Sequence, residues 1–161
     1  MKMSIATIAV VFVVSCSNCS ARLGETLDQC IARYGPPISS SSKPADLPNG
    51  LGESIATFDK NGVVVVAIFF KGTVGGESIL KADKSAFSDT EKSVLMDADC
   101  ANQTWNKMEG ISMDERYVRA DGSAYAICQN LDHALCFYSK DYFNALQAKQ
   151  AADQKDNLKS F

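Results

Sequence analysis

The sequence predicts an α+β fold in which a helix followed by a three-stranded antiparallel meander occurs twice, with a further helix at the C-terminus. Two segments begin with a capping box, and short β-rich runs separated by glycine-containing turns follow each of them. A helical pattern then closes the chain. We therefore expect a cleaved signal peptide over 1–21, a first unit over 22–84, a second unit with the C-terminal helix over 85–152, and a polar tail over 153–161.

The first predicted helix has well-defined ends. Thr26 is placed to act as the N-cap, and Gln29 three residues later completes a capping box. Gly35 follows the helix as a C′ residue, and Pro36 cannot continue it. Residues at helical spacing form its predicted apolar face: Leu27, Cys30, Ile31 and Tyr34. The next stretch, 38–51, is rich in serine and proline, which predicts an exposed and mobile loop.

A meander of three strands is predicted after this loop, at 53–59, 63–70 and 74–81, with tight turns at 60–62 and 71–73. The middle strand is apolar at every position, so both of its faces need cover. One helix can cover one face. We expect the other face to meet a second sheet, the second unit or another subunit.

The second unit begins with another capping box, formed by Ser88 and Glu91, and its helix is expected to run to about Cys100. The residues expected on its inner face are Val94, Leu95 and Ala98. Strands are predicted from Trp105 and over 115–119, 123–129 and 134–138. A last helix begins at Lys140, and the chain beyond Ala151 is expected to fray. The inward residues of that helix are Tyr142, Phe143 and Leu146.

The N-terminal segment has the features of a bacterial signal peptide. Lys2 precedes an uncharged run over 5–14, which has the length of a signal-peptide core and is too short to span a bilayer. Small residues permit cleavage after Ala21 or after Ser17. A third alternative is a lipobox-like stretch that ends at Cys16, which would make Cys16 the lipidation candidate. We expect an exported protein, periplasmic or extracellular, with an outer-membrane-anchored lipoprotein as the alternative.

Four cysteines lie beyond every predicted cleavage site: Cys30, Cys100, Cys128 and Cys136. An even number in an oxidising compartment favours two disulfides. Cys128 and Cys136 flank a predicted hairpin turn, and a turn centred on Asp132 would place them opposite each other on one face. Cys30 would then pair with Cys100. The alternative is that some of them remain buried thiols that pack as small apolar groups.

The opening of the first unit resembles a known family. Gly24-Glu25-Thr26, one amphipathic helix and Gly35-Pro36-Pro37 are similar to the start of the small outer-membrane lipoprotein family BamE/SmpA, whose fold the β-lactamase inhibitor proteins share in tandem duplicate. The chain departs from that family in its serine-rich loop and in Cys30 within the helix. The resemblance implies a non-catalytic, protein-binding role in the envelope. It implies no binding residues, because the matching positions begin and end a helix.

Few residues offer metal or acid–base chemistry. His133 is the single histidine, and it could bind zinc only together with Cys128 and Cys136, for which export favours a disulfide. Asp97 and Asp99 lie two residues apart on a predicted helix, so their side chains diverge and form no calcium loop. We therefore predict no catalytic, cofactor-binding or metal-binding residues.

Charge and short motifs exclude further classes. The chain has 16 basic and 19 acidic residues, a net charge of −3, and no basic stripe that would favour a nucleic-acid partner. Ser40 and Lys43 match the Ser-x-x-Lys motif of penicillin-binding enzymes, but they lie in a serine-rich loop without the partner motifs. Contact with a membrane is expected only through a lipid anchor.

Two functions follow from these observations. The first is an exported, non-catalytic binding or scaffold protein of the bacterial cell envelope, which acts through contacts with an envelope protein or by self-association. The alternative is a secreted small hydrolase or small-ligand-binding protein whose site combines distant carboxylates with aromatic side chains. Trp105, Tyr117 and Tyr125 are aromatic residues that could line such a pocket, and packing in the core is the alternative for each of them.

Overall fold

The computed structural model describes residues 23–110 and 113–159, so the predicted leader and Cys16 lie outside the described residues. Two short 3-10 helices, η1 and η2, accompany the main elements in these ranges. The α-helices are α1 (Leu27–Tyr34), α2 (Asp89–Ala98) and α3 (Lys140–Leu158). The strands are β1 (Ser39–Ser41), β2 (Ser54–Lys60), β3 (Val63–Phe70), β4 (Thr73–Lys81), β5 (Trp105–Lys107), β6 (Glu115–Arg119), β7 (Ala124–Gln129) and β8 (Ala134–Ser139).

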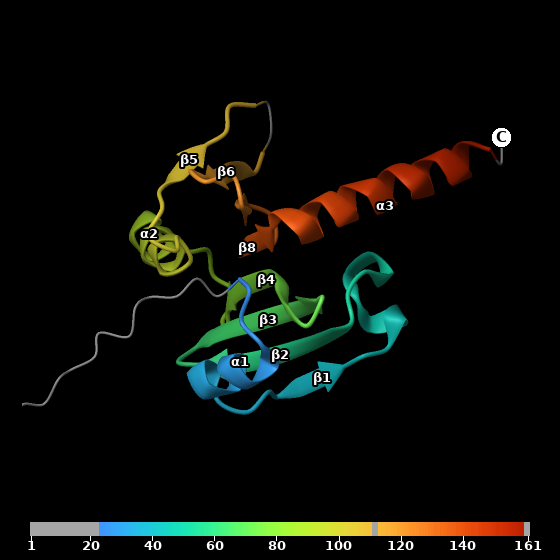
Figure 1. The fold of residues 1–161 in the computed structure, drawn as a ribbon. Coiled ribbons are helices and arrows are strands. Elements are labelled where there is room, and N and C mark those ends of the chain that lie inside the picture. The colour runs from blue at the N-terminus through green and yellow to red at the C-terminus, as the bar shows by residue number, and fades with distance from the viewer. Residues whose placement is uncertain (1–22, 111–112, 160–161) are drawn as a thin grey trace, which may run out of the picture.

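All of these strands belong to one eight-stranded antiparallel sheet, in the order β1-β2-β3-β4-β8-β7-β6-β5 (Figure 1). The prediction of a helix and a three-stranded meander occurring twice was therefore wrong. Pairing of β4 with β8, with Ile79 opposite Leu135, joins the strands of the two halves into a continuous sheet. This pairing satisfies two long strand edges that separate meanders would have left open. The sheet has its own outer edges at β1 and β5.

Residues 38–51 are also more ordered than the sequence predicts. Ser39–Ser41 form β1 against β2, and two short 3-10 helices, Pro44–Asp46 and Pro48–Gly50, follow. Serine has no strong preference for strands, so β1 forms because β2 offers an unpaired edge to the chain that returns from α1. The prediction of a loop without strand structure was wrong here.

Local chemistry sets the helix ends as predicted. The Thr26 and Gln29 capping box is present at α1, and the Ser88 and Glu91 box is present at α2. Gly35 ends α1 at a φ of 92°, a conformation that favours glycine. The C-terminal helix differs, because α3 continues to Leu158 where fraying was expected. Within the described residues, no helix is both long and apolar enough to cross a membrane.

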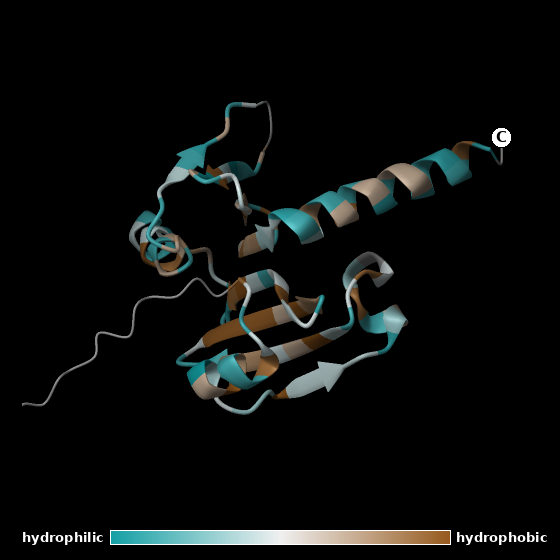
Figure 2. Ribbon diagram, in the orientation of Figure 1, coloured by the Kyte–Doolittle hydropathy of each residue, from teal (hydrophilic) through white to brown (hydrophobic). Residues whose placement is uncertain are grey.

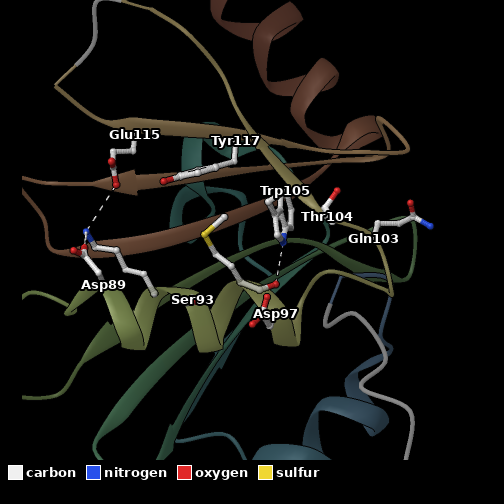
Figure 3. A pocket seen from close by; sticks show the side chains of 10 residues that line it. Asp89, Ser93, Asp97, Gln103, Thr104, Trp105, Glu115 and Tyr117 are labelled. Atoms are coloured by element: carbon white, nitrogen blue, oxygen red, sulfur yellow. Dashed lines mark hydrogen bonds and ion pairs between the residues drawn. The ribbon is translucent and has the colours of Figure 1, made fainter.

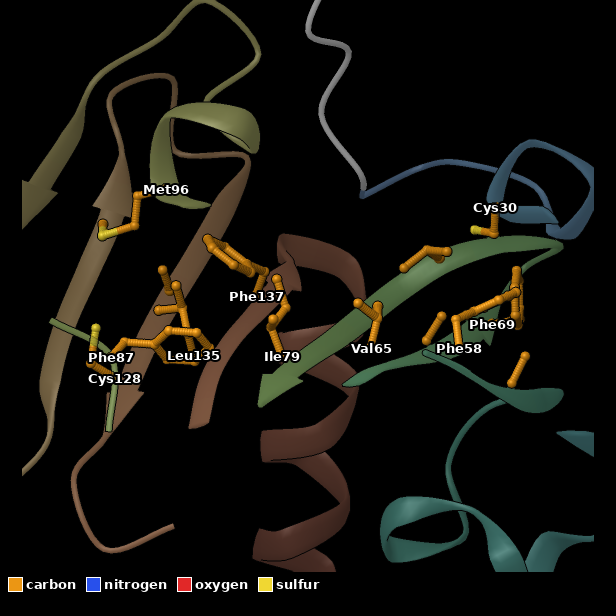
Figure 4. Packing of buried hydrophobic residues seen from close by; sticks show 14 residues of the cluster. Cys30, Phe58, Val65, Phe69, Ile79, Phe87, Met96, Cys128, Leu135 and Phe137 are labelled. Carbon is orange, nitrogen blue, oxygen red and sulfur yellow. The ribbon is translucent and has the colours of Figure 1, made fainter. Parts of the chain in front are cut away.

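The two faces of the sheet are covered differently. On one face, here called the α1–α2 face, α1 and α2 pack over a continuous apolar cluster that contains Phe58, Val65, Ile79, Leu135 and Phe137 (Figure 4). Figure 4 shows Cys30 of α1 and Met96 of α2 at opposite ends of this cluster. Three inner-face predictions were wrong, since Leu27, Ile31 and Val94 are exposed.

On the opposite face, here called the α3 face, only the first turns of α3 contact the sheet. Tyr142 is buried between Phe70 and Tyr138, at ring-centroid distances of 5.5 and 6.2 Å. Gly75 and Gly76 of β4 admit it, because a Cβ on Gly76 would lie 2.9 Å from the Tyr142 ring. Beyond residue 150 the described side chains of α3 are all exposed, and Figure 2 shows the polar colouring of this end.

The central strand β3 has cover on both faces, as its apolar sequence predicts. Val65, Ala67 and Phe69 are buried on the α1–α2 face, and Ile68 is buried on the α3 face. The cover there comes from α3, which belongs to the predicted second unit, so cover by the second unit is the one of the three expected alternatives that is confirmed. Val66 on this face remains half-buried.

Candidate functional site

A groove of about 500 Å³ lies between α2 and strands β5 and β6, at the end of the α1–α2 face (Figure 3). It is open to solvent on one side. The residues that line it are Asp89, Lys92, Ser93, Met96, Asp97, Gln103, Thr104, Trp105, Glu115 and Tyr117. We refer to it below as the α2 groove.

The regular geometry of helix and strands brings these residues together. On α2 the lining positions 89, 92, 93, 96 and 97 follow the spacing of one helical face. On the sheet, Trp105 lies opposite Arg119 and Lys107 lies opposite Tyr117. Because side chains alternate between the two faces of a strand, Trp105 and Tyr117 both point toward α2.

The middle of the groove is apolar and its main aromatic group is held in place. The Trp105 indole Nε1–H donates to the Met96 carbonyl oxygen at 2.9 Å, which ties β5 to α2. Behind the indole lies the fully buried Phe137 ring, at a centroid distance of 5.8 Å. Trp105 itself is half-buried, so part of its ring faces the groove.

One end of the groove carries a set of paired charges. Lys92 lies 3.3 Å from an Asp89 oxygen and 3.8 Å from a Glu115 oxygen, while Lys107 contacts the other Glu115 oxygen at 2.6 Å. The hydrogen bond from Lys107 lowers the pKa of Glu115. Burial lowers the pKa of Lys92, but its contacts with Asp89 and Glu115 outweigh this and raise it overall. Burial, helped by the Glu115 charge, raises the pKa of Tyr117. Charges at this end already neutralise one another.

The other end of the groove has a different electrostatic character. Asp97 is exposed in the last turn of α2, beside the uncharged Gln103 and Thr104. No basic residue stands in this last turn, whereas α1 has Arg33 and α3 has Lys155 there. The C-terminal end of a helix carries partial negative charge, and Asp97 adds to it.

This arrangement suits binding better than acid–base catalysis. A general acid at neutral pH needs a carboxyl group whose pKa is raised. The pKa of Glu115 is instead lowered by Lys107, so this carboxylate stays ionised and paired. What the groove offers is an aromatic wall with charge at its ends.

A second, smaller groove of about 390 Å³ lies beside α1 on the same face of the sheet. Its lining residues are Leu27, Ser40, Ser41, Ser42, Lys43, Ser54, Ile55, Ala56 and Phe69. Ser40 and Lys43 of the Ser-x-x-Lys motif both belong to it. Ser40 lies on β1 and Lys43 precedes a 3-10 helix, so the serine is not at the start of an α-helix as that enzyme class requires.

The four cysteines of the described chain are all free thiols in the structure. Cys128 lies opposite Leu135, and Cys136 lies opposite Ile127, so the two cysteines point to opposite faces of the sheet. The expected same-face geometry was wrong because the turn is centred between Leu131 and Asp132. A one-residue change of register moves a side chain to the other face. Cys136 accordingly contacts Ser78 on the α3 face, at 3.4 Å between Sγ and Oγ.

The other predicted ligand and disulfide residues are dispersed. Cys30 lies on the buried face of α1, where burial and the nearby Glu25 raise its thiol pKa to about 12. Cys100 is half-buried just after α2. His133 occupies the β7–β8 turn with a φ of 52°. Across residues 23–110 and 113–159, no three potential ligands gather as a metal site.

Two of the three aromatic residues expected in a pocket line the α2 groove, namely Trp105 and Tyr117. Tyr125 does not, because its ring stacks on Phe143 of α3 at 4.4 Å. Sequence reasoning missed the contribution of α2 to the site. The polar residues between Asp89 and Asp97 recur at helical spacing, which indicates a polar face on α2 in addition to its buried face. This pattern could have predicted the contribution of α2.

Comparison of the chain with known proteins gives no significant match to a family model, a curated protein or a solved structure. The resemblance to BamE/SmpA therefore stays a prediction that rests on Gly24 to Pro37.

Proposed function

We propose that this chain is an exported, non-catalytic binding protein of the bacterial cell envelope, and that it docks a segment of a partner protein in the α2 groove. One observation carries the proposal. An aromatic groove with polar ends lies directly beside β5, an edge strand of the sheet. A partner segment can therefore use side-chain and backbone contacts at the same place.

The backbone of β5 is suited to pairing with such a segment. Met108 donates its N–H to the Arg116 carbonyl at 2.8 Å, and Thr104 accepts from the Ala120 N–H at 2.8 Å. Hydrogen-bonding direction alternates along an antiparallel strand, so the N–H and C=O groups of Trp105 and Lys107 point outward. Within the part of the chain that the structure describes, no strand pairs with this outer side. Addition of an extended segment to an exposed edge is a recurring mode of peptide recognition.

Export and envelope location rest on the sequence of the leader, with Cys16 as the lipidation candidate. The acidic character of the chain supports a protein partner over a nucleic acid.

A second candidate function, a small-ligand-binding protein or hydrolase, is favoured by the carboxylates that share the groove with Trp105. The proposal of a protein partner is stronger, because only such a partner uses the neighbouring strand edge.

Site-specific photo-crosslinking in cells that express the full chain tests the proposal. A photoreactive residue at Thr104 samples the α2 groove, and one at Ser42 samples the α1 groove as a matched control. We expect a discrete protein adduct from position 104 only, found in the envelope fraction and removed by Trp105→Ala. Equal adducts from both positions, or none from position 104, would contradict docking in the α2 groove. An adduct of twice the chain mass would identify a second copy as the partner.

A further inference from the structure

The open end of the α2 groove has negative charge that the described chain does not neutralise. Asp89 and Glu115 share Lys92, but Asp97 makes no ion pair with any described residue. It lies in the last turn of α2, where the helix itself has no basic residue. The cation nearest the helix end, Arg119, contacts the Asp99 carbonyl at 3.4 Å and forms its ion pair with Asp121, so it does not pair with Asp97. A ligand group at this end would therefore be favoured if it were positive.

The aromatic wall next to Asp97 is suited to the same kind of group. Trp105 is half-buried with its indole fixed by the bond to the Met96 carbonyl, so one side of the ring is presented to the groove (Figure 3). Tryptophan is the aromatic residue that attracts cations most strongly. Lys107 already stands over the neighbouring Tyr117 ring at 6.0 Å, whereas none of the described cation–ring contacts involves Trp105.

We infer that the partner of the α2 groove presents a basic, extended segment, with an arginine or lysine side chain stacked on Trp105 and paired with Asp97. Charge complementarity selects this occupant, and the outward backbone groups of β5 provide pairing for the extended chain on either side of the basic residue. The inference rests on the proposed function, because it specifies the chemistry of the partner at the same site. A guanidinium group suits it best, since its plane can stack on the indole while its N–H groups reach the carboxylate.

Fluorescence gives a direct test, because Trp105 is the single tryptophan of the chain. The protein purified from cells that express the full chain is titrated with end-blocked peptides of alternating arginine and serine, alternating glutamine and serine, or alternating glutamate and serine. We expect a saturable change in Trp105 emission with the arginine peptide, at an affinity at least about fivefold above that of the glutamine peptide. The glutamate peptide should bind more weakly still.

Matched variants separate local recognition from general attraction to an acidic protein. Asp97→Asn should weaken binding of the arginine peptide at least about fivefold. Asp59→Asn removes the same charge from an exposed position on β2, in the opposite half of the sheet, and should leave the affinity unchanged. Equal weakening by both variants would overturn the inference, because it would mean that net charge alone attracts the peptide.

The remaining outcomes separate this inference from the proposed function. If the glutamine peptide binds as tightly as the arginine peptide, the groove binds peptides but the basic partner is wrong. If arginine amide alone binds as tightly as the peptide, the site holds a small cation and the extended segment is wrong. If no peptide changes the emission while the position 104 adduct forms, the inference fails and the proposed function stands. If no peptide changes the emission of Trp105 and no adduct forms at position 104, both the basic partner and the proposed function are wrong.

Discussion

The grooves beside α1 and α2 occupy comparable positions but have different chemistry. Each lies on the same face of the sheet, between a short helix and an edge strand, because neither helix is wide enough to cover the strands at its end. The α1 groove is lined by serines and apolar side chains with Lys43 as its single charge. Carboxylates and the rings of Trp105 and Tyr117 line the α2 groove. A groove at the edge of the sheet is thus a consequence of the fold, and the difference in lining is the reason why we propose the α2 groove as the binding site.

The edge strands beside the two grooves, β1 and β5, differ in how easily another strand can pair with them. β1 is three residues long and lies between Pro37 and Pro44, which limit further pairing on that side. β5 is equally short, but no proline lies beside it, since Thr104 precedes it and Met108 follows it. The edge at the α2 groove therefore accepts an added strand more readily than the edge at the α1 groove.

The ion pairs near α1 and those beside α2 also differ in where they lie. Under α1, Arg33 binds Glu25 with its Nε 3.1 Å from either oxygen, and the Tyr34 hydroxyl donates to buried Glu77 at 2.8 Å. Beside α2, the paired charges lie at the rim of the groove. These contacts of Arg33 and Tyr34 stabilise the packing of α1 on the sheet, whereas the ion pairs at the rim of the α2 groove remain accessible to solvent.

Thiol reactivity should show the largest contrast. Burial raises the pKa of Cys128 to about 11 and that of Cys30 to about 12, so both stay protonated at mildly alkaline pH. We expect half-buried Cys100 to be alkylated first. Protection of Cys30 and Cys128 should be on the order of a thousandfold or more, because their exposure requires opening of the structure. Mass spectrometry of timed samples measures the order of modification.

The order within the protected pair tests the comparison more sharply. Cys30 lies on a helix of eight residues, and such a short helix opens locally at low cost. Cys128 lies on a strand paired on both sides, so it is exposed only when the sheet opens. We expect Cys30 to react before Cys128. The reverse order would show that the α2 half is the more easily opened one.

Two buried phenylalanines provide a matched pair of stability variants. Phe58 lies under Tyr34 of α1, and Phe137 lies behind Trp105, and neither is exposed at all. Phe58→Ala and Phe137→Ala should each lower the free energy of unfolding by about 3–5 kcal/mol, through lost burial and a residual cavity. Urea unfolding followed by far-ultraviolet circular dichroism measures both.

Only one member of this pair should alter the α2 groove. Phe137→Ala removes the support of the indole and should shift the emission of Trp105 in the folded protein, whereas Phe58→Ala should not. Phe→Leu at the same positions gives milder variants if either alanine variant fails to fold. An equal shift in both would mean that the grooves are structurally coupled.

Loss of the partly buried ion pair between Arg33 of α1 and Glu25 should have a smaller effect. Arg33→Ala leaves Glu25, which is 7% exposed, without its bidentate partner, and we expect a loss of about 1.5–3 kcal/mol of unfolding free energy. The same variant should speed alkylation of Cys30, because Cys30 lies on the same helix. Arg33→Lys retains the charge and should recover part of the stability. No change in either measurement would show that α1 is held by apolar packing alone.

Local signals account for the parts of the fold that the sequence predicted. The capping boxes at Thr26 and Ser88 and the apolar run over 63–70 depend on neighbouring residues, and the structure has those helices and that strand. The pairing of β4 with β8 joins residues far apart in the chain, and no local pattern specifies it. The position of Cys128 relative to Cys136 depended on the centre of a turn, where an error of half a residue reverses the face.

The candidate site was predictable only in part for the same reason. Aromatic residues in strands could be named, and Trp105 and Tyr117 do line the groove. The sequence does not specify how α2 crosses β5 and β6. It therefore could not predict that Trp105 and Tyr117 face a helix, or which face of that helix they meet. The role of Asp97 became visible only when the last turn of α2 was placed beside the indole.

The smallest expected effect on stability is that of Lys107→Ala at the rim of the α2 groove. The Lys107 side chain is 60% exposed, so solvent screens its ion pair with Glu115 and the pair should contribute little to the free energy of unfolding. Lys107 lowers the pKa of Glu115, and a carboxyl group with a lowered pKa contributes stability at neutral pH that is lost as the pH falls. Wild type and variant should therefore differ slightly in urea unfolding at neutral pH and converge in acid.

The same variant should act on binding in the opposite direction. Removal of Lys107 takes a positive charge from beside the groove and frees the Tyr117 ring that it covers at 6.0 Å. The arginine peptide should consequently bind Lys107→Ala about two- to threefold more tightly than wild type, as the titration of Trp105 emission would measure. Weaker binding would indicate that Lys107 contacts the partner through its stem or through the edge of β5. The sign of this small change thus decides whether the charge of the groove or its edge strand dominates recognition.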